Sequence, residues 1–267
     1  MPLAVNQGTF LDYEVLPGDG PPLLMIRGLS RDRRFWMGLE QLLTRSFTVI
    51  VFDNRGVGRS SKPEGWWTVP QMADDAAAVI RAAGFERVHV FGMSLGGMIS
   101  QELVLRHADL VDRLVLGCTG PGTPEGSRPP PWVVLSMLTA IGLPNWLSNK
   151  IVVRITLSPE HRVAHPETGQ TWLDLLEQDD VSRWSVFKQM VGALRHHSAS
   201  RLSGITTPTL VLCGDSDRLI PPSNSEYLAR HIPGCSMEWI SGAGHDFPAE
   251  QPEETTQAIE RFCLGRA

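Results

Sequence analysis

The chain has 267 residues, which is long enough to bury a large hydrophobic core. Hydrophobic residues make up 42% and charged residues 20%, a composition that excludes an intrinsically disordered protein. The 24 basic and 29 acidic residues give a formal charge of −5, which offers no electrostatic footprint for nucleic acid. The chain has no basic amphipathic segment of the kind that binds a membrane surface. No stretch approaches the roughly 20 apolar residues of a membrane helix.

Cysteine usage and the first residues bear on the cellular compartment. The four cysteines are scattered without a C-x-x-C spacing, at Cys118, Cys213, Cys235 and Cys263. They indicate neither a zinc site nor a redox motif, so we expect reduced, mostly buried thiols. Residues 1–6 lack the charged and apolar regions of a signal peptide. We therefore expect a soluble, cytoplasmic protein.

The first 119 residues alternate short apolar runs with amphipathic segments of helical length. Strands are expected at residues 10–15, 23–26, 49–52, 88–91 and 114–116. Helices are expected at residues 35–43, 72–83 and 95–107. This β-α-β-α alternation is typical of a mostly parallel sheet that is covered by helices on both faces.

The alternation stops near residue 119 and resumes after Thr207-Pro208. Strands are then expected at residues 210–213 and 237–240, and helices at 223–231 and 252–264. The segment between is rich in proline and glycine at its start and then helical in character. We therefore predict an α/β core domain formed by residues 1–119 and 202–267, interrupted by a helical lid formed by residues 120–201.

The predicted lid contains aromatic residues and histidines. Its tryptophans and one methionine are expected to pack the lid onto the core, and at least one of them to line an apolar pocket: Trp132, Trp146, Trp172, Trp184 and Met137. Its four histidines, His161, His165, His196 and His197, have no acidic or thiol partner at a metal-like spacing. They are expected to be solvated, and no metal site is predicted.

The segment Gly92-Met93-Ser94-Leu95-Gly96 follows a predicted strand and opens a predicted helix. G-x-S-x-G in this context predicts a nucleophile on a sharp turn. The flanking glycines let neighbouring chain approach without a clash. The turn exposes the serine hydroxyl at the carboxyl end of the sheet, beside a helix N-terminus that favours negative charge. Ser94 is therefore the predicted nucleophile.

A serine hydroxyl needs a base to accept its proton, and that base needs a carboxylate to orient it. His245 lies in the loop after the last predicted strand, so it can reach Ser94 at the carboxyl edge of the sheet. Asp215 and Asp217 both follow the strand at 210–213. From their chemistry alone, either could be the orienting acid, and either could serve the turn instead.

These motifs together resemble those of α/β-hydrolase-fold enzymes over essentially the whole chain. The matching segments are Phe52–Ser60, Gly92–Met98, Gly214–Asp217 and Gly244-His245. The chain order serine, aspartate, histidine is that of the family, and the family pattern implies Asp217 as the acid. Asp53–Pro63 and Gly92–His107 are most similar to the 3-oxoadipate enol-lactonase and polyketide methylesterase branch.

The resemblance also implies an oxyanion hole formed by the backbone N–H groups of Leu95 and Leu29. Two such donors stabilise a tetrahedral oxyanion, and loss of one typically costs about 3 kcal/mol of barrier. Many relatives have His-Gly where this chain has Arg27-Gly28. Two interpretations of Arg27 remain open: it pairs with a nearby carboxylate, or it contacts an anionic substrate.

The predicted activity is that of a carboxylesterase-like serine hydrolase acting on a small-molecule ester or lactone through an acyl-enzyme. Ser94, Asp217 and His245 are the predicted catalytic residues, and this chemistry needs no metal or organic cofactor. A carbon–carbon bond hydrolase, an acyltransferase or a perhydrolase would use the same triad. A non-catalytic ligand receptor on the same fold is the alternative from another class, because fold alone does not settle function.

Overall fold

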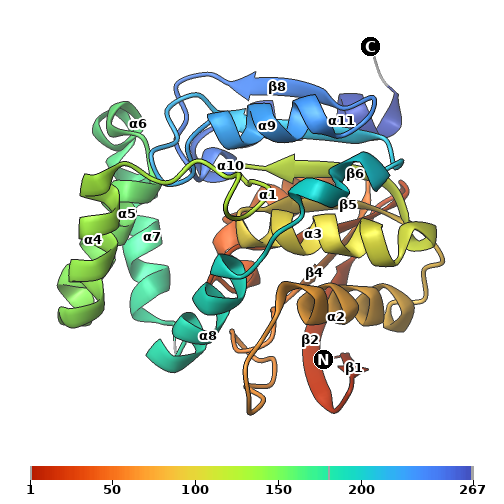
Figure 1. Ribbon diagram of the computed structural model, residues 1–267, viewed down its shortest axis with the longest axis horizontal. Helices are drawn as coiled ribbons and strands as arrows, with labels where there is room; N and C mark the ends of the chain where they lie inside the picture. Colours follow the sequence, from red (N-terminus) through yellow and green to blue (C-terminus); the bar gives the residue numbers. More distant parts are fainter. Residues whose placement is uncertain (1, 180, 266–267) are drawn as a thin grey trace.

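An eight-stranded sheet forms the centre of the molecule (Figure 1). The computed structural model describes residues 2–179 and 181–265. The strands are β1 (Leu3–Asn6), β2 (Thr9–Leu16), β3 (Pro22–Ile26), β4 (Thr48–Phe52), β5 (Val88–Met93), β6 (Val111–Gly117), β7 (Thr209–Gly214) and β8 (Ser236–Ile240). Their spatial order is β1-β2-β4-β3-β5-β6-β7-β8. Pairing is antiparallel from β1 to β4 and parallel from β4 to β8, so the prediction of a mostly parallel sheet is confirmed.

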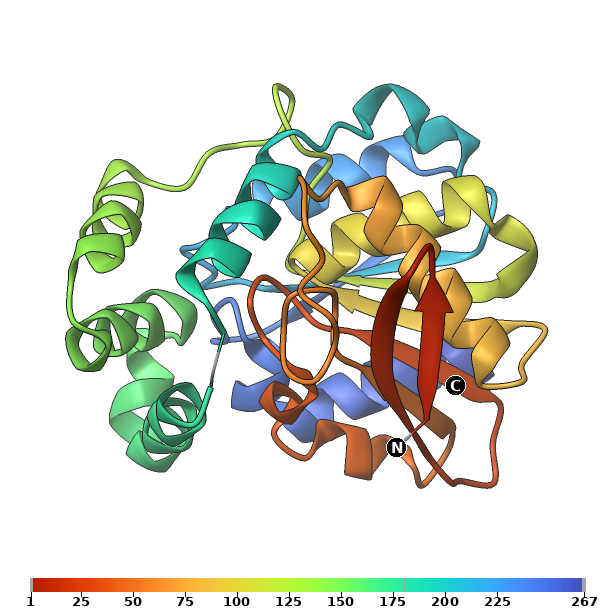
Figure 2. The same ribbon diagram turned by 90° about the horizontal axis from the view of Figure 1, so that it is seen from below.

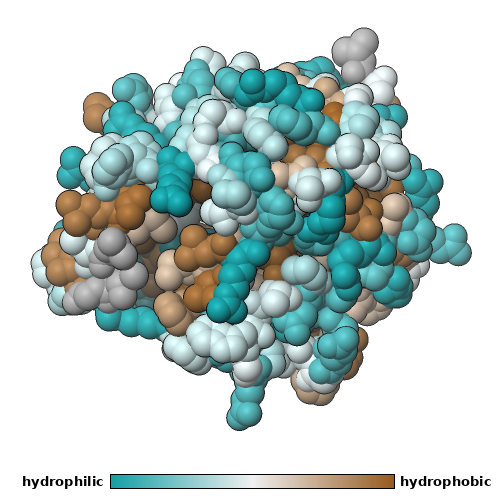
Figure 3. All heavy atoms as spheres, in the orientation of Figure 1, coloured by the Kyte–Doolittle hydropathy of each residue, from teal (hydrophilic) through white to brown (hydrophobic). Residues whose placement is uncertain are grey.

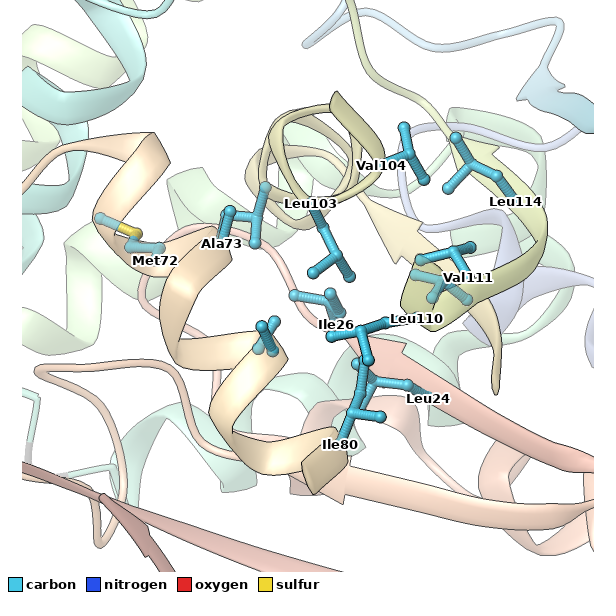
Figure 4. Close-up of a cluster of buried hydrophobic side chains, with 14 of the residues drawn as sticks. Leu24, Ile26, Met72, Ala73, Ile80, Leu103, Val104, Leu110, Val111 and Leu114 are labelled. Carbon is cyan, nitrogen blue, oxygen red and sulfur yellow. The ribbon is translucent and has the colours of Figure 1, made fainter. Parts of the chain in front are cut away.

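Helices cover both faces of the sheet. Those of the core are α1 (Leu39–Leu43), α2 (Val69–Ala82), α3 (Leu95–Arg106), α9 (Ser223–His231), α10 (Phe247–Glu250) and α11 (Pro252–Leu264). One hydrophobic cluster joins α2, α3 and α9 to the sheet, and a second joins α1 and α11 to the opposite face. Figure 4 shows the first cluster, in which Leu103 of α3 lies near Ile26 and Ile80 of α2 lies near Leu24, both residues of β3. All of β5 is buried, which explains its continuous apolar sequence.

Several predicted elements differ in extent from the observed ones. The predicted helix at 35–43 is a 3₁₀ turn, Arg33–Trp36, followed by α1, because Met37 and Gly38 have positive φ angles of 54° and 93°. Helix α2 begins before the predicted residue 72, where Thr68 and Gln71 form a capping box. Strand β1 and helix α10 were not predicted, since each is only four residues long.

Between β6 and β7, residues 120–201 form a segment that we call the insert, and its described residues contain five α-helices. They are α4 (Pro131–Gly142), α5 (Asn145–Thr156), α6 (Pro159–Ala164), α7 (Pro166–Glu177) and α8 (Arg183–Leu194). In two views they lie to one side of the sheet (Figures 1 and 2). Among the described residues, no helix is both long and apolar enough to span a lipid bilayer.

The tryptophans of the insert have different environments. Trp172 is buried and its ring contacts Phe35 of the core, with ring centroids 5.0 Å apart. This contact docks α7 onto the core, as predicted. Trp132, Trp146 and Trp184 are exposed, at 44%, 60% and 56%. Trp184 still contacts the core, because its ring centroid lies 5.8 Å from that of Trp66, and the Arg218 guanidinium lies 5.9 Å from the Trp132 centroid. The Trp146 ring instead lies 5.5 Å from Lys150 of the insert itself. Figure 3 shows hydrophobic side chains gathered at the surface over α4.

A buried ion pair fixes the loop after β4 to helix α2. Arg55 donates two hydrogen bonds, of 2.6 and 2.7 Å, to Asp75, whose side chain is 1% exposed. Asn6 of β1 donates a third to the same carboxylate, at 2.8 Å. The neighbouring Asp74 instead pairs with Arg106 near the surface, where their side chains are 24% and 43% exposed.

These two adjacent aspartates give a matched test of burial. Asp75→Ala should destabilise the fold by about 3–5 kcal/mol, because it leaves the Arg55 charge buried without its partner. Asp74→Ala should cost at most about 1 kcal/mol, because its ion pair is exposed to solvent. Urea denaturation of both variants measures the difference. Equal losses of unfolding free energy would contradict this account of the loop.

Candidate active site

Ser94 joins β5 directly to α3 in a strained turn. Its backbone angles are φ 57° and ψ −120°, a conformation that residues with a side chain rarely adopt. The Ser94 N–H donates to the carbonyl of Gly117 on the neighbouring strand, at 2.8 Å. Thr119 donates from its hydroxyl to the Ser94 carbonyl, also at 2.8 Å. The backbone of the predicted nucleophile is therefore fixed on both sides.

The glycines around Ser94 are required by close packing. A Cβ at Gly96 would lie 2.0 Å from the carbonyl oxygen of Ile26, at the end of β3. A Cβ at Gly92 would lie 2.0 Å from the Ser100 hydroxyl oxygen. Neither position has room for a side chain. The glycines therefore allow α3 to approach both β5 and β3, which fixes the direction of Ser94.

His245 and Asp217 form a buried hydrogen-bonded pair. His245 Nδ1 lies 2.8 Å from Asp217 Oδ2, and the two side chains are 6% and 0% exposed. The other oxygen of Asp217 accepts hydrogen bonds from the N–H groups of Leu219 and Ile220, at 2.8 and 2.9 Å. An ionised carboxylate in this position accepts the Nδ1 proton, which leaves Nε2 as a proton acceptor.

Asp215 has a different role from Asp217. It is exposed, and its Oδ1 accepts from the Gly242 N–H at 2.9 Å and from the Ser216 hydroxyl at 3.1 Å. These bonds link two loops at the carboxyl edge of the sheet. Of the two aspartates that the sequence left open, Asp217 contacts His245 and Asp215 serves the turn.

The histidine loop is held by the insert as well as by the core. The His245 N–H donates to the carbonyl of Thr156, the last residue of α5, at 2.9 Å. The buried carboxylate of Glu250 accepts from the N–H groups of Gly244 at 3.0 Å and Ser158 at 3.1 Å. Burial raises the pKa of Glu250, and those backbone donors oppose the rise. Glu250, which the sequence reasoning missed, therefore connects the loop to the insert.

Arg27 pairs with a carboxylate, which is one of the two predicted alternatives. Its guanidinium donates to both oxygens of Asp246, at 2.9 and 2.7 Å, and the two side chains are 3% and 1% exposed. It also lies over the Trp36 ring, 4.8 Å from the centroid, and donates to the Met93 sulfur at 2.9 Å. Since Asp246 follows His245, this pair links the loop after β3 to the histidine loop.

The loop after β3 passes close to the predicted nucleophile. A Cβ on Gly28 would lie 3.0 Å from the Cβ and 3.5 Å from the Oγ of Ser94. Leu29 follows directly, and Leu95 is the first residue of α3, where backbone N–H groups have no partner within the helix. Of the two predicted oxyanion-hole residues, Leu29 thus follows Gly28, which borders Ser94, and Leu95 follows Ser94 itself.

A cavity of about 320 Å³ opens over these groups. Ser94, His245 and Leu29 line it from the core, and its insert side is largely apolar. The insert residues that line it include Met137, Ala140, Val152, Ile155, Trp172, Leu176, Val186, Phe187 and Met190. The structure thus brings Ser94 and His245 to one cavity. A second hollow, of about 570 Å³, lies between β1 and α2 and contains none of the predicted site residues.

Some of the charged residues that line the cavity were missed from the sequence, among them Arg31 and Asp179. Burial lowers the pKa of Arg31 to about 10, so Arg31 stays protonated at neutral pH. Burial, with the nearby charge of Asp32, raises the pKa of Asp179 to about 6. No spacing rule singles out either residue, because they meet only when the insert docks.

Gln189 of α8 also escaped prediction. It is fully buried, accepts from the Ser30 N–H at 2.7 Å, and donates to the carbonyl of Arg55 at 2.9 Å. It therefore ties the insert to two core loops. A lone glutamine in an amphipathic helix carries no sequence signal for such a contact.

Among the described residues, one group has the proximity expected of metal ligands: Cys118, Asp217 and His245, with ligand atoms within 4.8 Å of one another. The carboxylate and the imidazole are already hydrogen-bonded to each other. Burial raises the pKa of the Cys118 thiol well above its usual value, which favours the protonated form over the thiolate that binds metals. These three residues are better explained as a histidine–carboxylate pair beside a buried thiol.

The prediction of four solvated histidines is wrong for His196. It is 3% exposed, and its Nδ1 lies 3.6 Å from the buried carboxylate of Glu102. Burial lowers its pKa to about 4. Its backbone carbonyl accepts from the Thr123 N–H at 3.2 Å, so this segment packs against the chain leaving β6. His196 therefore has a structural place at the base of the insert.

The four cysteines agree with the sequence interpretation. All four are free, and three of them are buried, with Cys235 partly exposed. Burial raises the pKa of Cys235 to about 11 and that of Cys263 to about 12.

Comparisons with known proteins agree with the observed fold. Residues 21–252 match the family described as alpha/beta hydrolase fold. The provisionally named carbamate hydrolase RutD of Azorhizobium caulinodans is 28% identical, with 98% of each chain covered. Its counterpart in Yersinia enterocolitica is 31% identical over 94% of this chain and 92% of its own length.

Solved structures are similar over the whole chain. Est816, described as an N-acyl homoserine lactone degrading enzyme, has a TM-score of 0.85 at 28% identity, covering 98% of this chain and 100% of its own. A thermophilic esterase from Thermogutta terrifontis has a TM-score of 0.84 at 27% identity, covering 99% and 97%. The family model spans most of the chain, and the relatives match almost end to end. The chain therefore belongs to the α/β hydrolase fold family and is a hydrolase.

Proposed function

We propose that this hydrolase cleaves carboxylic ester or lactone bonds with Ser94 as nucleophile, His245 as general base and Asp217 as the orienting acid. The observation that carries the proposal is the convergence of three separate segments. A strained serine and a histidine that is hydrogen-bonded to a buried aspartate line one cavity. Both the resemblance of the motifs and the esterase and lactonase relatives support the same chemistry.

The reaction would proceed in two acyl-transfer steps. Nε2 of His245 accepts the proton of Ser94 as Oγ attacks the substrate carbonyl. The backbone N–H groups of Leu29 and Leu95 stabilise the resulting oxyanion. The imidazolium then protonates the leaving alcohol, and an acyl-enzyme remains. Water, deprotonated by the same imidazole, attacks the acyl carbon and releases the acid.

Carbamates are a second candidate substrate class, favoured by the names of the relatives from Azorhizobium and Yersinia. A carbamate ester presents the same kind of carbonyl to Ser94, with nitrogen in place of carbon beside it. The same triad would therefore act on it. Rates on matched aryl esters, lactones and aryl carbamates would rank the three classes.

The insert, residues 120–201, would serve as a lid over the core formed by residues 1–119 and 202–267. Its apolar side chains line the cavity that contains Ser94. Such walls exclude water and strengthen the electrostatic interactions within. The exposed aromatic rings of Trp184 and Phe187 stack at 5.4 Å beside this region, and Phe187 also lines the cavity.

Replacement of the nucleophile is the most direct test. Ser94→Ala should lower kcat on short p-nitrophenyl esters by at least about 10⁴-fold, since residual activity would come only from binding and the oxyanion hole. It should also abolish labelling by a fluorophosphonate. A thermal melt serves as the control for folding. Wild-type turnover in a folded Ser94→Ala protein would refute the proposal, and failure of the wild type to label would favour a non-catalytic receptor.

The assignment of the acid has its own matched pair. Asp217→Asn would present an amide N–H to His245 Nδ1 and favour the wrong tautomer, so kcat should fall by about 10³- to 10⁴-fold. Asp215→Asn keeps an oxygen that can accept from the Gly242 N–H, so its effect should be small. Steady-state kinetics on one ester compares the two. The opposite ranking would reassign the orienting carboxylate to Asp215.

A further inference from the structure

Arg31 ends a tight turn that begins at Gly28, the residue beside the predicted nucleophile Ser94. Its backbone N–H donates to the carbonyl of Gly28 at 3.3 Å, and Ser30 between them has a φ of 55°. Gly28 is the residue that borders Ser94 most closely on this side. The turn is held from the insert by the bond between the Ser30 N–H and Gln189. The backbone of Arg31 is thus held in place beside the candidate active site.

Two aromatic rings hold the Arg31 side chain. Its guanidinium carbon lies 5.0 Å from the ring centroid of Phe35 in the core and 5.4 Å from that of Trp172 in α7. The guanidinium donates to the Ser30 carbonyl at 3.2 Å. A guanidinium has five N–H donors, and this bond uses one of them. Within residues 2–179 and 181–265, no carboxylate lies within 4 Å of it in an ion pair.

Arg27, in the same region, has a carboxylate partner. Its two terminal guanidinium nitrogens donate to both oxygens of Asp246 and to the Met93 sulfur, and only its buried Nε lacks a described partner. Arg31 has no such partner among the described residues and lines the same cavity as Ser94 and His245. Aromatic walls orient a guanidinium and limit its hydration without using its in-plane donors. A carboxylate entering the cavity would therefore find the guanidinium already oriented to donate two parallel N–H hydrogen bonds.

We propose that Arg31 forms an anion subsite and that the substrate is an ester or lactone bearing a carboxylate in its acyl or alcohol part. This inference rests on the proposed function, because it names the substrate class of the same site. The subsite replaces the anion-binding role that the sequence allowed for Arg27. It also supplies a charged anchor on the core side of a cavity whose insert side is largely apolar.

Asp179 is expected to weaken anion binding at this subsite. It lines the cavity, and its charge interacts with Arg31, Arg34 and Asp32 without closing an ion pair on Arg31. When ionised, Asp179 repels an incoming carboxylate. Arg31 and Asp179 should therefore shift the preference for anionic substrates in opposite directions, which a merely structural role of Arg31 would not produce.

The test uses the full chain and two pairs of esters at fixed pH. The first pair places the carboxylate in the acyl part: mono-4-nitrophenyl glutarate against 4-nitrophenyl 5-methylhexanoate. The second places it in the alcohol part: 4-carboxyphenyl acetate against 4-isopropylphenyl acetate. For each pair, the ratio of kcat/KM for the anionic ester to that for the neutral ester is measured. A ratio cancels losses of folding or of triad activity that affect both esters.

Arg31→Met should lower this ratio about tenfold or more in at least one pair, the size expected for losing a charged hydrogen bond. Arg31→Lys should lower it less, since it keeps the charge and loses the fork. Asp179→Asn should raise it. Arg183→Met is the control. It removes a cavity-lining charge whose guanidinium already donates to the carbonyl of Leu143 and to Asn145, at 2.8 and 3.2 Å.

An unchanged ratio in both pairs for Arg31→Met would overturn the inference. An equal fall of the ratio for Arg183→Met would also overturn it, because the preference would then come from the overall positive charge of the cavity and not from Arg31. In either case Ser94-dependent hydrolysis by the wild type would leave the proposed function intact. A wild-type protein that cleaves none of the four esters and fails to label with a fluorophosphonate would refute the proposed function and this inference with it.

Discussion

The backbone conformation of Ser94 is the constraint on which the site depends. A non-glycine residue at φ 57° and ψ −120° costs of order 1–3 kcal/mol and persists only where its surroundings determine it. Here the surroundings are a sheet and a helix in contact at backbone distance, made possible by Gly92 and Gly96. The packing of Ser94 against the buried strands β3, β5 and β6 is therefore what holds its hydroxyl toward the cavity.

Buried charged residues fix the positions of the other segments of the site. The Arg27–Asp246 pair joins the loop after β3 to the histidine loop, and Glu250 joins the histidine loop to the insert. A buried ion pair adds little net stability, because desolvation offsets much of its Coulomb attraction. Its partners must nevertheless stay together, since either charge alone would be costly. We infer that these pairs set the geometry of His245 more than the stability of the chain.

The sheet and the nucleophile turn could be predicted because their signals are local. Buried parallel strands such as β5 are continuous apolar runs, and the glycines at 92 and 96 follow from the turn itself. The choice between Asp215 and Asp217 needed either a family pattern or coordinates, because both lie in one turn. Arg31 and Glu250 carried no signal, because each has a partner in the insert, Trp172 and Ser158 respectively, that lies more than 90 residues away. Tertiary contacts of this range have no local pattern to reveal them.

The cavity has two sides of different chemical character, and they are not independent. The core supplies Ser94, His245 and Arg31, whereas the insert supplies most of the apolar wall together with the charged residues Asp179 and Arg183. Exchange of insert side chains could therefore change substrate preference while the triad remains. Yet the end of α5 accepts the His245 N–H, and Trp172 of α7 helps to hold Arg31. A movement of α5 would consequently disturb the histidine loop, and a movement of α7 would disturb the proposed anion subsite. Binding and catalysis would then be coupled through the same backbone contacts, so that the reactive geometry is complete only when the insert is docked.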